Sequence, residues 1–162
     1  MTEDHPIKPV CPYGLTKWVG EQYFDLLGMD DVCILRYANV YGLGCRGIVA
    51  AFKDCVENNK SPIMYGTGDD TTRDYIHIKD VVGANRYALK GDLKGVYNVS
   101  TGISTTPKQL WNVMSEVYPN DIPVIYEDFR EGECVNNVLS SEKLQRMGWE
   151  LTVGLKDGLL DI

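Results

Sequence analysis

Apolar side chains recur with a helical period in residues 13 to 27. One stripe consists of Leu15, Trp18, Val19, Tyr23, Leu26 and Leu27, and this spacing predicts an amphipathic helix. A second stripe on the same helix consists of Tyr13, Lys17, Gly20 and Phe24. Gly28 follows as a suitable C-terminal stop. We therefore expect a helix with one face for packing and another for chemistry or a second contact.

The rest of the chain alternates between short apolar runs and amphipathic segments. The run at 31–36 is rich in β-branched residues, which is typical of a buried parallel strand. Further strands are predicted at 62–65, 74–78, 96–99 and 122–126, and helices at 48–58, 80–89, 107–118, 140–147 and 152–160. Alternating strands and helices predict an α/β fold. No repeat, low-complexity tract or linker interrupts residues 1–162, so we expect a single folding unit.

Several polar residues have predicted structural roles. Thr106 and Gln109 form a capping-box pattern, with Pro107 at the first helical position. Asp80 is expected to cap the helix at 80–89, while His77 is expected to serve by hydrogen bonding. The three prolines in residues 1–12 predict an extended loop at the start of the chain.

Composition narrows the class of protein without identifying it. The chain of 162 residues is 44% hydrophobic and 24% charged, which suits one globular domain with its own core. Its net charge of −7 argues against nucleic acid or an anionic membrane surface as a partner. It has no apolar run of about 18 residues, and its acidic first residues do not resemble a signal peptide. The five cysteines form no zinc or disulfide pattern, so we expect reduced thiols, no metal and a cytoplasmic protein.

Tyr13 and Lys17 are the candidate catalytic pair. They lie four residues apart, so on a helix they project from one face, one turn apart. An ammonium beside a phenol favours the phenolate, because an opposite charge stabilises the charged form. A tyrosine in that setting can take and return a proton near neutral pH. The pattern by itself is common, and on most helices such a pair is an ordinary surface feature.

The stretch at 42–47 reads Gly-Leu-Gly-Cys-Arg-Gly and matches Gly-x-Gly-x-x-Gly literally. It lies between a predicted strand and a predicted helix, which is the context of a dinucleotide-binding loop. We nevertheless interpret it as a glycine-rich connection. Several residues are expected between the end of the strand and Gly42, whereas the dinucleotide-binding loop turns at once. In addition, no acidic residue ends the next strand near Tyr65.

Three motifs, in order, carry a family resemblance. They are Pro-Tyr-Gly-Leu-Thr-Lys at 12–17, Arg-Tyr-Ala-Asn-Val-Tyr-Gly at 36–42, and Tyr-Gly-Thr-Gly-Asp-Asp at 65–70 with Thr-Arg-Asp-Tyr-Ile-His at 72–77. With them, the chain resembles the extended short-chain dehydrogenase/reductase family. Within that family it is most similar to the NAD-dependent nucleotide-sugar epimerases and dehydratases of the UDP-glucose 4-epimerase kind. The resemblance runs from about residue 2 to residue 158. The family's glycine-rich phosphate loop, its first strands and its upstream catalytic Ser/Thr have no counterpart here.

The resemblance implies a fold and a reaction. The expected fold is a partial Rossmann-like unit, with its late strands and the Tyr-x-x-x-Lys helix, plus a small α/β substrate-binding domain. Residues 1–46 would end the Rossmann portion, and residues 47–162 would mainly bind the nucleotide sugar. Tyr13 would remove the proton of the sugar 4-hydroxyl while hydride passes to NAD. Lys17 would hold the cofactor ribose and favour the phenolate, so both residues also count as cofactor-binding.

The resemblance also implies a set of substrate-binding residues. Arg73 and Arg130 would bind the UDP diphosphate through their planar forks of donors. Glu133 would lie near the nucleotide ribose. Asn39 would contact the phosphate or the sugar, and Tyr75 would lie beside the nucleotide.

The uridine would be bordered by the backbone at Gly47 and Ile48 and by the side of Tyr65. Taken alone, either arginine has an ordinary explanation as a surface charge or a structural ion pair, for instance Arg73 with Asp74. The chain departs from the family at residue 11, where cysteine replaces the common serine or threonine. It also lacks the family's usual aspartate within residues 136–140.

Three functional interpretations stay open. The chain is the half of an epimerase-like enzyme with little or no activity alone, a UDP-sugar-binding module, or an interaction module that pairs with a separate nucleotide-binding chain. We expect it not to retain NAD, because the phosphate loop has no counterpart. The family's Tyr-x-x-x-Lys helix also contributes to a dimeric helix bundle, so a homo-oligomer is expected.

Overall fold

The computed structural model describes residues 1–91, 93–129 and 135–162. The helices are α1 (Pro12–Leu26), α2 (Ile48–Glu57), α3 (Ile78–Lys90), α4 (Pro107–Val117), α5 (Glu142–Arg146) and α6 (Leu155–Leu159). The strands are β1 (Cys33–Tyr37), β2 (Asn39–Tyr41), β3 (Ile63–Tyr65), β4 (Thr72–Arg73), β5 (Tyr75–His77), β6 (Gly95–Val99), β7 (Ile125–Glu127) and β8 (Asn136–Asn137). The predicted α/β class is confirmed.

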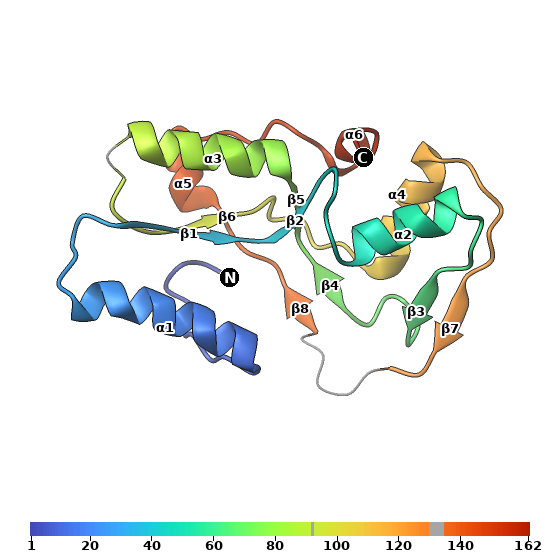
Figure 1. The fold of residues 1–162 in the computed structure, drawn as a ribbon, viewed down its shortest axis with the longest axis horizontal. Coiled ribbons are helices and arrows are strands. Elements are labelled where there is room, and N and C mark those ends of the chain that lie inside the picture. The colour runs from blue at the N-terminus through green and yellow to red at the C-terminus, as the bar shows by residue number, and fades with distance from the viewer. Residues whose placement is uncertain (92, 130–134) are drawn as a thin grey trace.

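The described strands pair in parallel, and partners lie far apart in sequence. β1 pairs with β6, β2 with β5, β3 with β7 and β4 with β8. Parallel neighbours need a crossover between them, which explains the helices and long connections that separate the partners. In Figure 1, α3 lies on one side of β1 and β6, and α1 lies on the other.

The buried side chains form two clusters. The first packs α2, α4 and α6 together and consists of Tyr41, Val49, Phe52, Met64, Tyr75, Leu110, Trp111, Met114 and Leu159. The second packs α3 and α5 against β5 and β6 and consists of Ile76, Val81, Ala84, Leu93, Tyr97, Val99, Leu144 and Trp149. Adjacent residues of one strand, Tyr75 and Ile76, belong to different clusters, because successive side chains of a strand point to opposite faces. β5 therefore joins the two cores.

Helix α1 has the predicted extent but not a buried packing face. None of its residues is buried. Leu15, Val19 and Tyr23 of the apolar stripe are 47%, 39% and 60% exposed. The hydrophobic period therefore identified the helix correctly, whereas the described residues leave most of the predicted packing stripe exposed and cover Trp18 only in part.

The predicted start of the helix at 80–89 is wrong, and so is the capping role of Asp80. Helix α3 begins at Ile78, and His77 is its N-cap, with a ring nitrogen that accepts a hydrogen bond from the Lys79 amide. The Asp80 carboxylate is 2% exposed and bonds across the fold to residues 152 and 153. A carboxylate aimed at a distant segment cannot cap its own helix, so the capping role passes to His77.

Three other predicted boundaries also differ from the structure. Thr152 does not begin the last helix, because its amide and hydroxyl both bond to Asp80, and α6 begins at residue 155 after Gly154. Helix α5 begins at residue 142 rather than at Ser140. The strand expected at 122–126 begins later and ends one residue further on, as β7 at residues 125–127, which pairs with β3 in parallel.

Candidate active site

A cavity of about 1620 Å³ runs between α1 and β1 and continues along β2, β3, β5 and the start of α2. Eight residues that the resemblance assigns to catalysis or substrate binding line it, namely Tyr13, Lys17, Asn39, Gly47, Ile48, Tyr65, Arg73 and Tyr75. Two further predicted residues, Arg130 and Glu133, lie outside the described residues. The structure thus brings the described candidates together, while the chemical role of each stays a prediction.

The Tyr13–Lys17 pair lies in the first turns of α1, on the cavity. Pro12 occupies the start of the helix, and the Cys11 sulfur caps it by accepting a hydrogen bond from the Gly14 amide at 3.4 Å. The Lys17 Nζ lies 5.4 Å from the centre of the Tyr13 ring. The Tyr13 side chain is 71% exposed, so its phenol is open to a ligand that enters the cavity.

A forked ion pair that the sequence analysis missed holds α1 against β1. Arg36 of β1 donates from Nε and Nη2 to the two carboxylate oxygens of Glu21, at 2.9 and 2.6 Å. Its Nη1 donates to the Glu3 carbonyl oxygen at 3.1 Å. The hydrogen bonds that Arg36 donates to Glu21 raise the pKa of the guanidinium. Because Glu21 lies one turn beyond Lys17, the pair aims the Tyr13–Lys17 face at the strand.

Three candidate substrate residues are set by neighbouring strands. Asn39 of β2 lies opposite Tyr75 of β5. The Arg73 backbone forms two hydrogen bonds with Thr105, at 3.0 and 2.9 Å, and its Nη1 donates to the Thr72 carbonyl at 2.9 Å. Burial raises the pKa of Tyr75 to about 12. Its phenol is therefore neutral at physiological pH.

The glycine-rich connection at 42–47 needs one correction. The expected gap between strand and loop is wrong, because β2 ends at Tyr41 and Gly42 follows directly. β1 ends at Tyr37, and after Ala38 the chain forms a second short strand, β2, which pairs with β5. The loop leads into α2, whose N-cap Gly47 has φ of 88°, in the region that favours glycine. Arg46 and Gly47 both line the cavity, and no capping side chain bonds to the first turn of α2.

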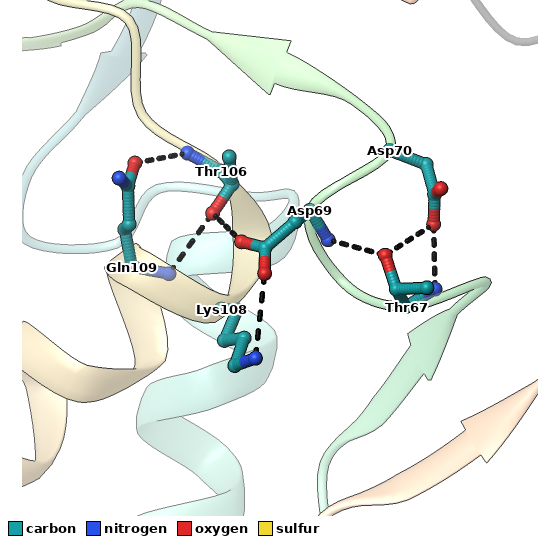
Figure 2. A network of polar contacts seen from close by, with 6 residues as sticks. All are labelled: Thr67, Asp69, Asp70, Thr106, Lys108 and Gln109. Atoms are coloured by element: carbon teal, nitrogen blue, oxygen red, sulfur yellow. Dashed lines mark hydrogen bonds and ion pairs between the residues drawn. The ribbon is translucent and has the colours of Figure 1, made fainter.

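The turn between Tyr65 and Arg73 is fixed by a polar network, which Figure 2 shows. Thr106 Oγ1 donates to Asp69 Oδ1 at 2.7 Å, and Lys108 Nζ lies 3.3 Å from Asp69 Oδ2. These contacts, the Thr106 bond first, lower the pKa of the Asp69 carboxyl.

The same network contains the predicted capping box. The Thr106 hydroxyl accepts from the Gln109 amide, and the Gln109 side chain accepts from the Thr106 amide, so the prediction from sequence is confirmed. Within the turn, Asp70 Oδ2 accepts from the amide and hydroxyl of Thr67. The start of α4 therefore braces the turn that joins two candidate substrate residues.

Other kinds of site find no support in the described ranges. No helix there is both long and apolar enough to cross a bilayer. No group of three or more His, Cys, Asp or Glu side chains within them is arranged to hold a metal ion.

Comparison with solved structures defines the class of protein. The chain superposes on a UDP-glucose 4-epimerase of Thermotoga maritima, solved with UDP-glucose, with a TM-score of 0.89 and 32% identity over 99% of this chain and 54% of that one. It superposes on the Thermus thermophilus UDP-glucose 4-epimerase in complex with NAD with a TM-score of 0.88 and 29% identity, over 98% of this chain and 55% of that one. The fold is therefore that of about half of a Rossmann-type epimerase.

The particular family follows from sequence. The NAD dependent epimerase/dehydratase family matches residues 1–100, and the chain belongs to that family. A protein of Methanocaldococcus jannaschii, provisionally named UDP-glucose 4-epimerase, is 36% identical over 98% of this chain. The UDP-glucose 4-epimerase of Rhizobium meliloti is 31% identical over 93% of it. The chain spans about half the length of these relatives, 54% and 53% respectively.

Proposed function

We propose that this chain carries the acid–base pair and the nucleotide-sugar site of a UDP-sugar 4-epimerase. The observation that carries the proposal is the convergence of eight candidate residues, from α1 to β5, on one cavity. In this assignment Tyr13 takes the proton of the sugar 4-hydroxyl and later returns it. Residues 1–46 supply this catalytic end, and residues 47–162 mainly supply the substrate end.

Different parts of the cavity wall suit the diphosphate and the uracil base of a UDP-sugar. Arg73 lies at the end where β4 and β8 pair, and the chain reaches β8 soon after the segment that contains Arg130. The proposal places the diphosphate at Arg73, and the resemblance alone assigns Arg130 to it. The uncapped first turn of α2 adds backbone N–H groups, which also favour an anion. Tyr65 offers a ring face for the base.

The nicotinamide end fits the open face of α1. When bound, NAD supplies the acceptance and return of hydride at C4 of the sugar. The Tyr13 phenol is exposed on the cavity, and the Lys17 ammonium lies beside its ring. In the proposal, Lys17 holds the cofactor ribose beside Tyr13. The dinucleotide phosphates find no matching glycine-rich loop in these residues, so we propose that this chain does not retain NAD.

Titration of UDP into the purified chain tests the proposed function. UDP should bind with measurable heat, whereas ADP should bind much more weakly, because the site is built around the uridine side of a nucleotide sugar. Denaturing the protein should release no stoichiometric NAD(H), as measured by mass spectrometry. Failure of UDP to bind would defeat the substrate assignment, and stoichiometric NAD would make the 42–47 loop a dinucleotide site.

We also propose that the chain self-associates through α1. Leu15 and Leu26 of α1 and Leu27 at its C-cap are 47%, 81% and 69% exposed, and an exposed apolar stripe of this kind favours association. Light scattering at micromolar concentration should therefore show a dimer or a larger species. The same stripe favours a second candidate function, a half that pairs with a separate nucleotide-binding chain. A clean monomer at that concentration would contradict self-association.

The proposed setting is the cytoplasm. Cys11, Cys33, Cys45 and Cys55 are all free thiols, and free thiols are typical of a reducing compartment.

A further inference from the structure

Asp74 lies between two candidate substrate residues and points away from the cavity that they line. It joins β4 to β5, so Arg73 and Tyr75 flank it in sequence. Both neighbours line the cavity, whereas Asp74 does not. Its side chain is fully buried, with 0% exposure. Alternation along an extended strand explains this arrangement, since Asp74 faces the opposite side from both neighbours.

The buried carboxylate has a complete set of donors from one segment. Oδ1 accepts hydrogen bonds from the Thr101 amide at 3.0 Å and from the Thr101 hydroxyl at 2.7 Å. Oδ2 accepts one from the Gly102 amide at 2.9 Å. Bonds to an ionised acceptor are shorter and stronger than neutral ones. Asp74 therefore anchors its strand to the segment that follows β6.

The Asp74 backbone extends this anchor to a third candidate residue. Its carbonyl oxygen accepts from the Asn39 amide at 2.9 Å, and its amide donates to the Asn137 carbonyl at 3.2 Å. The residue thus connects β2, β5 and β8 at one point. A shift of its strand would displace Arg73, Tyr75 and Asn39 together.

We propose that Asp74 is a positioning residue, which fixes Arg73, Tyr75 and Asn39 for the nucleotide sugar through its bonds to residues 101 and 102. The assignment rests on the proposed function, because it concerns the same site. Asp74 itself touches no ligand in this account. It acts by holding the strand in register.

The fold contains a second clamp of the same chemistry, which serves as an internal control. Asp80 Oδ1 accepts from the amide and the hydroxyl of Thr152, at 2.9 and 2.5 Å, and Oδ2 accepts from the Val153 amide at 3.1 Å. The pattern of two bonds from a threonine and one from the next amide is the same as at Asp74. No residue of this second clamp lines the cavity.

The matched variants Thr101→Val and Thr152→Val test the assignment without removing either carboxylate. Each deletes one hydroxyl-to-carboxylate bond and keeps the side-chain shape, and Thr101→Val also removes the oxygen that accepts the Ile103 amide at 3.1 Å. Misaligning the arginine that binds the diphosphate weakens its charge-assisted bonds, so Thr101→Val should weaken UDP binding by about tenfold in calorimetric titration. Thr152→Val should bind UDP within about twofold of the parent, although both variants should lose thermal stability, Thr101→Val somewhat more because it removes two hydrogen bonds rather than one. Thr101→Ser, which keeps the hydroxyl, should restore the affinity.

Hydrogen exchange supplies a readout that does not need the ligand. The Asn39 amide donates to the Asp74 carbonyl, so loosening Asp74 should expose that amide to exchange. Its exchange should therefore be faster in Thr101→Val than in the parent, and in Thr152→Val it should equal the parent's. Parental affinity in Thr101→Val, or an equal loss in both valine variants, would overturn the assignment and leave Asp74 a purely structural residue. If the parent itself binds no UDP, the proposed function fails and the assignment falls with it.

Discussion

Replacing Asp80 with alanine should lower the free energy of unfolding by about 2–3 kcal/mol, measured by urea denaturation. The buried carboxylate accepts three hydrogen bonds from Thr152 and Val153. A bond to a charged acceptor is worth about 1.5–3 kcal/mol, and neighbouring bonds are not additive. Removing the carboxylate leaves three donors without their acceptor. It also frees the segment that leads into α6, which packs on the first core.

Glu116→Ala is the matched control, because it removes a carboxylate that is ion-paired but exposed. Glu116 pairs with Lys156 at 2.7 Å, with both side chains about 60% exposed (60% and 59%). Exposed pairs contribute little, so we expect a change of at most about 0.5–1 kcal/mol. Equal effects of the two substitutions would show that the Asp80 clamp is no stronger than a surface ion pair.

Replacing Arg73 with alanine should weaken UDP binding by about tenfold or more in calorimetric titration. A charge-assisted hydrogen bond to phosphate is worth about 1.5–3 kcal/mol, and each 1.4 kcal/mol is one decade in affinity. The guanidinium lines the cavity from β4, whose backbone is held on one side by Thr105 and on the other by β8. The resemblance predicts a similar loss for Arg130→Ala.

Two control variants show whether the loss in Arg73→Ala comes from the diphosphate contact. One removes an arginine charge elsewhere, and the other removes the proposed catalytic phenol. Arg86→Ala removes the same charge from an exposed position on α3 that does not line the cavity, so its affinity should equal that of the parent. Tyr13→Phe should also bind UDP normally, because the phenol addresses the sugar 4-hydroxyl rather than the nucleotide. If Arg73→Ala binds UDP as well as Arg86→Ala does, the diphosphate lies elsewhere.

The sequence by itself was sufficient for the family and for most elements. The three motifs at 12–17, 36–42 and 65–77 identified the epimerase family, and the family match over residues 1–100 confirms it. Helix α1 and the capping box of Thr106 and Gln109 follow the prediction because both depend on local spacing. A helical period of 3.6 residues and a capping box that spans three residues both depend only on residues close together in sequence.

Only the tertiary structure decided where side chains find their partners. His77 rather than Asp80 caps α3, since a carboxylate can bond equally well to its own helix or to a segment 72 residues away. The Arg36–Glu21 fork and the Asp74 clamp were likewise invisible, because they join segments 15 and 27 residues apart. Hydrophobic spacing also assigned a packing face to α1 without showing that the described residues leave most of that face exposed. Local patterns fix backbone conformation over a few residues, whereas burial and polar partners depend on contacts between distant segments, which no window of sequence contains.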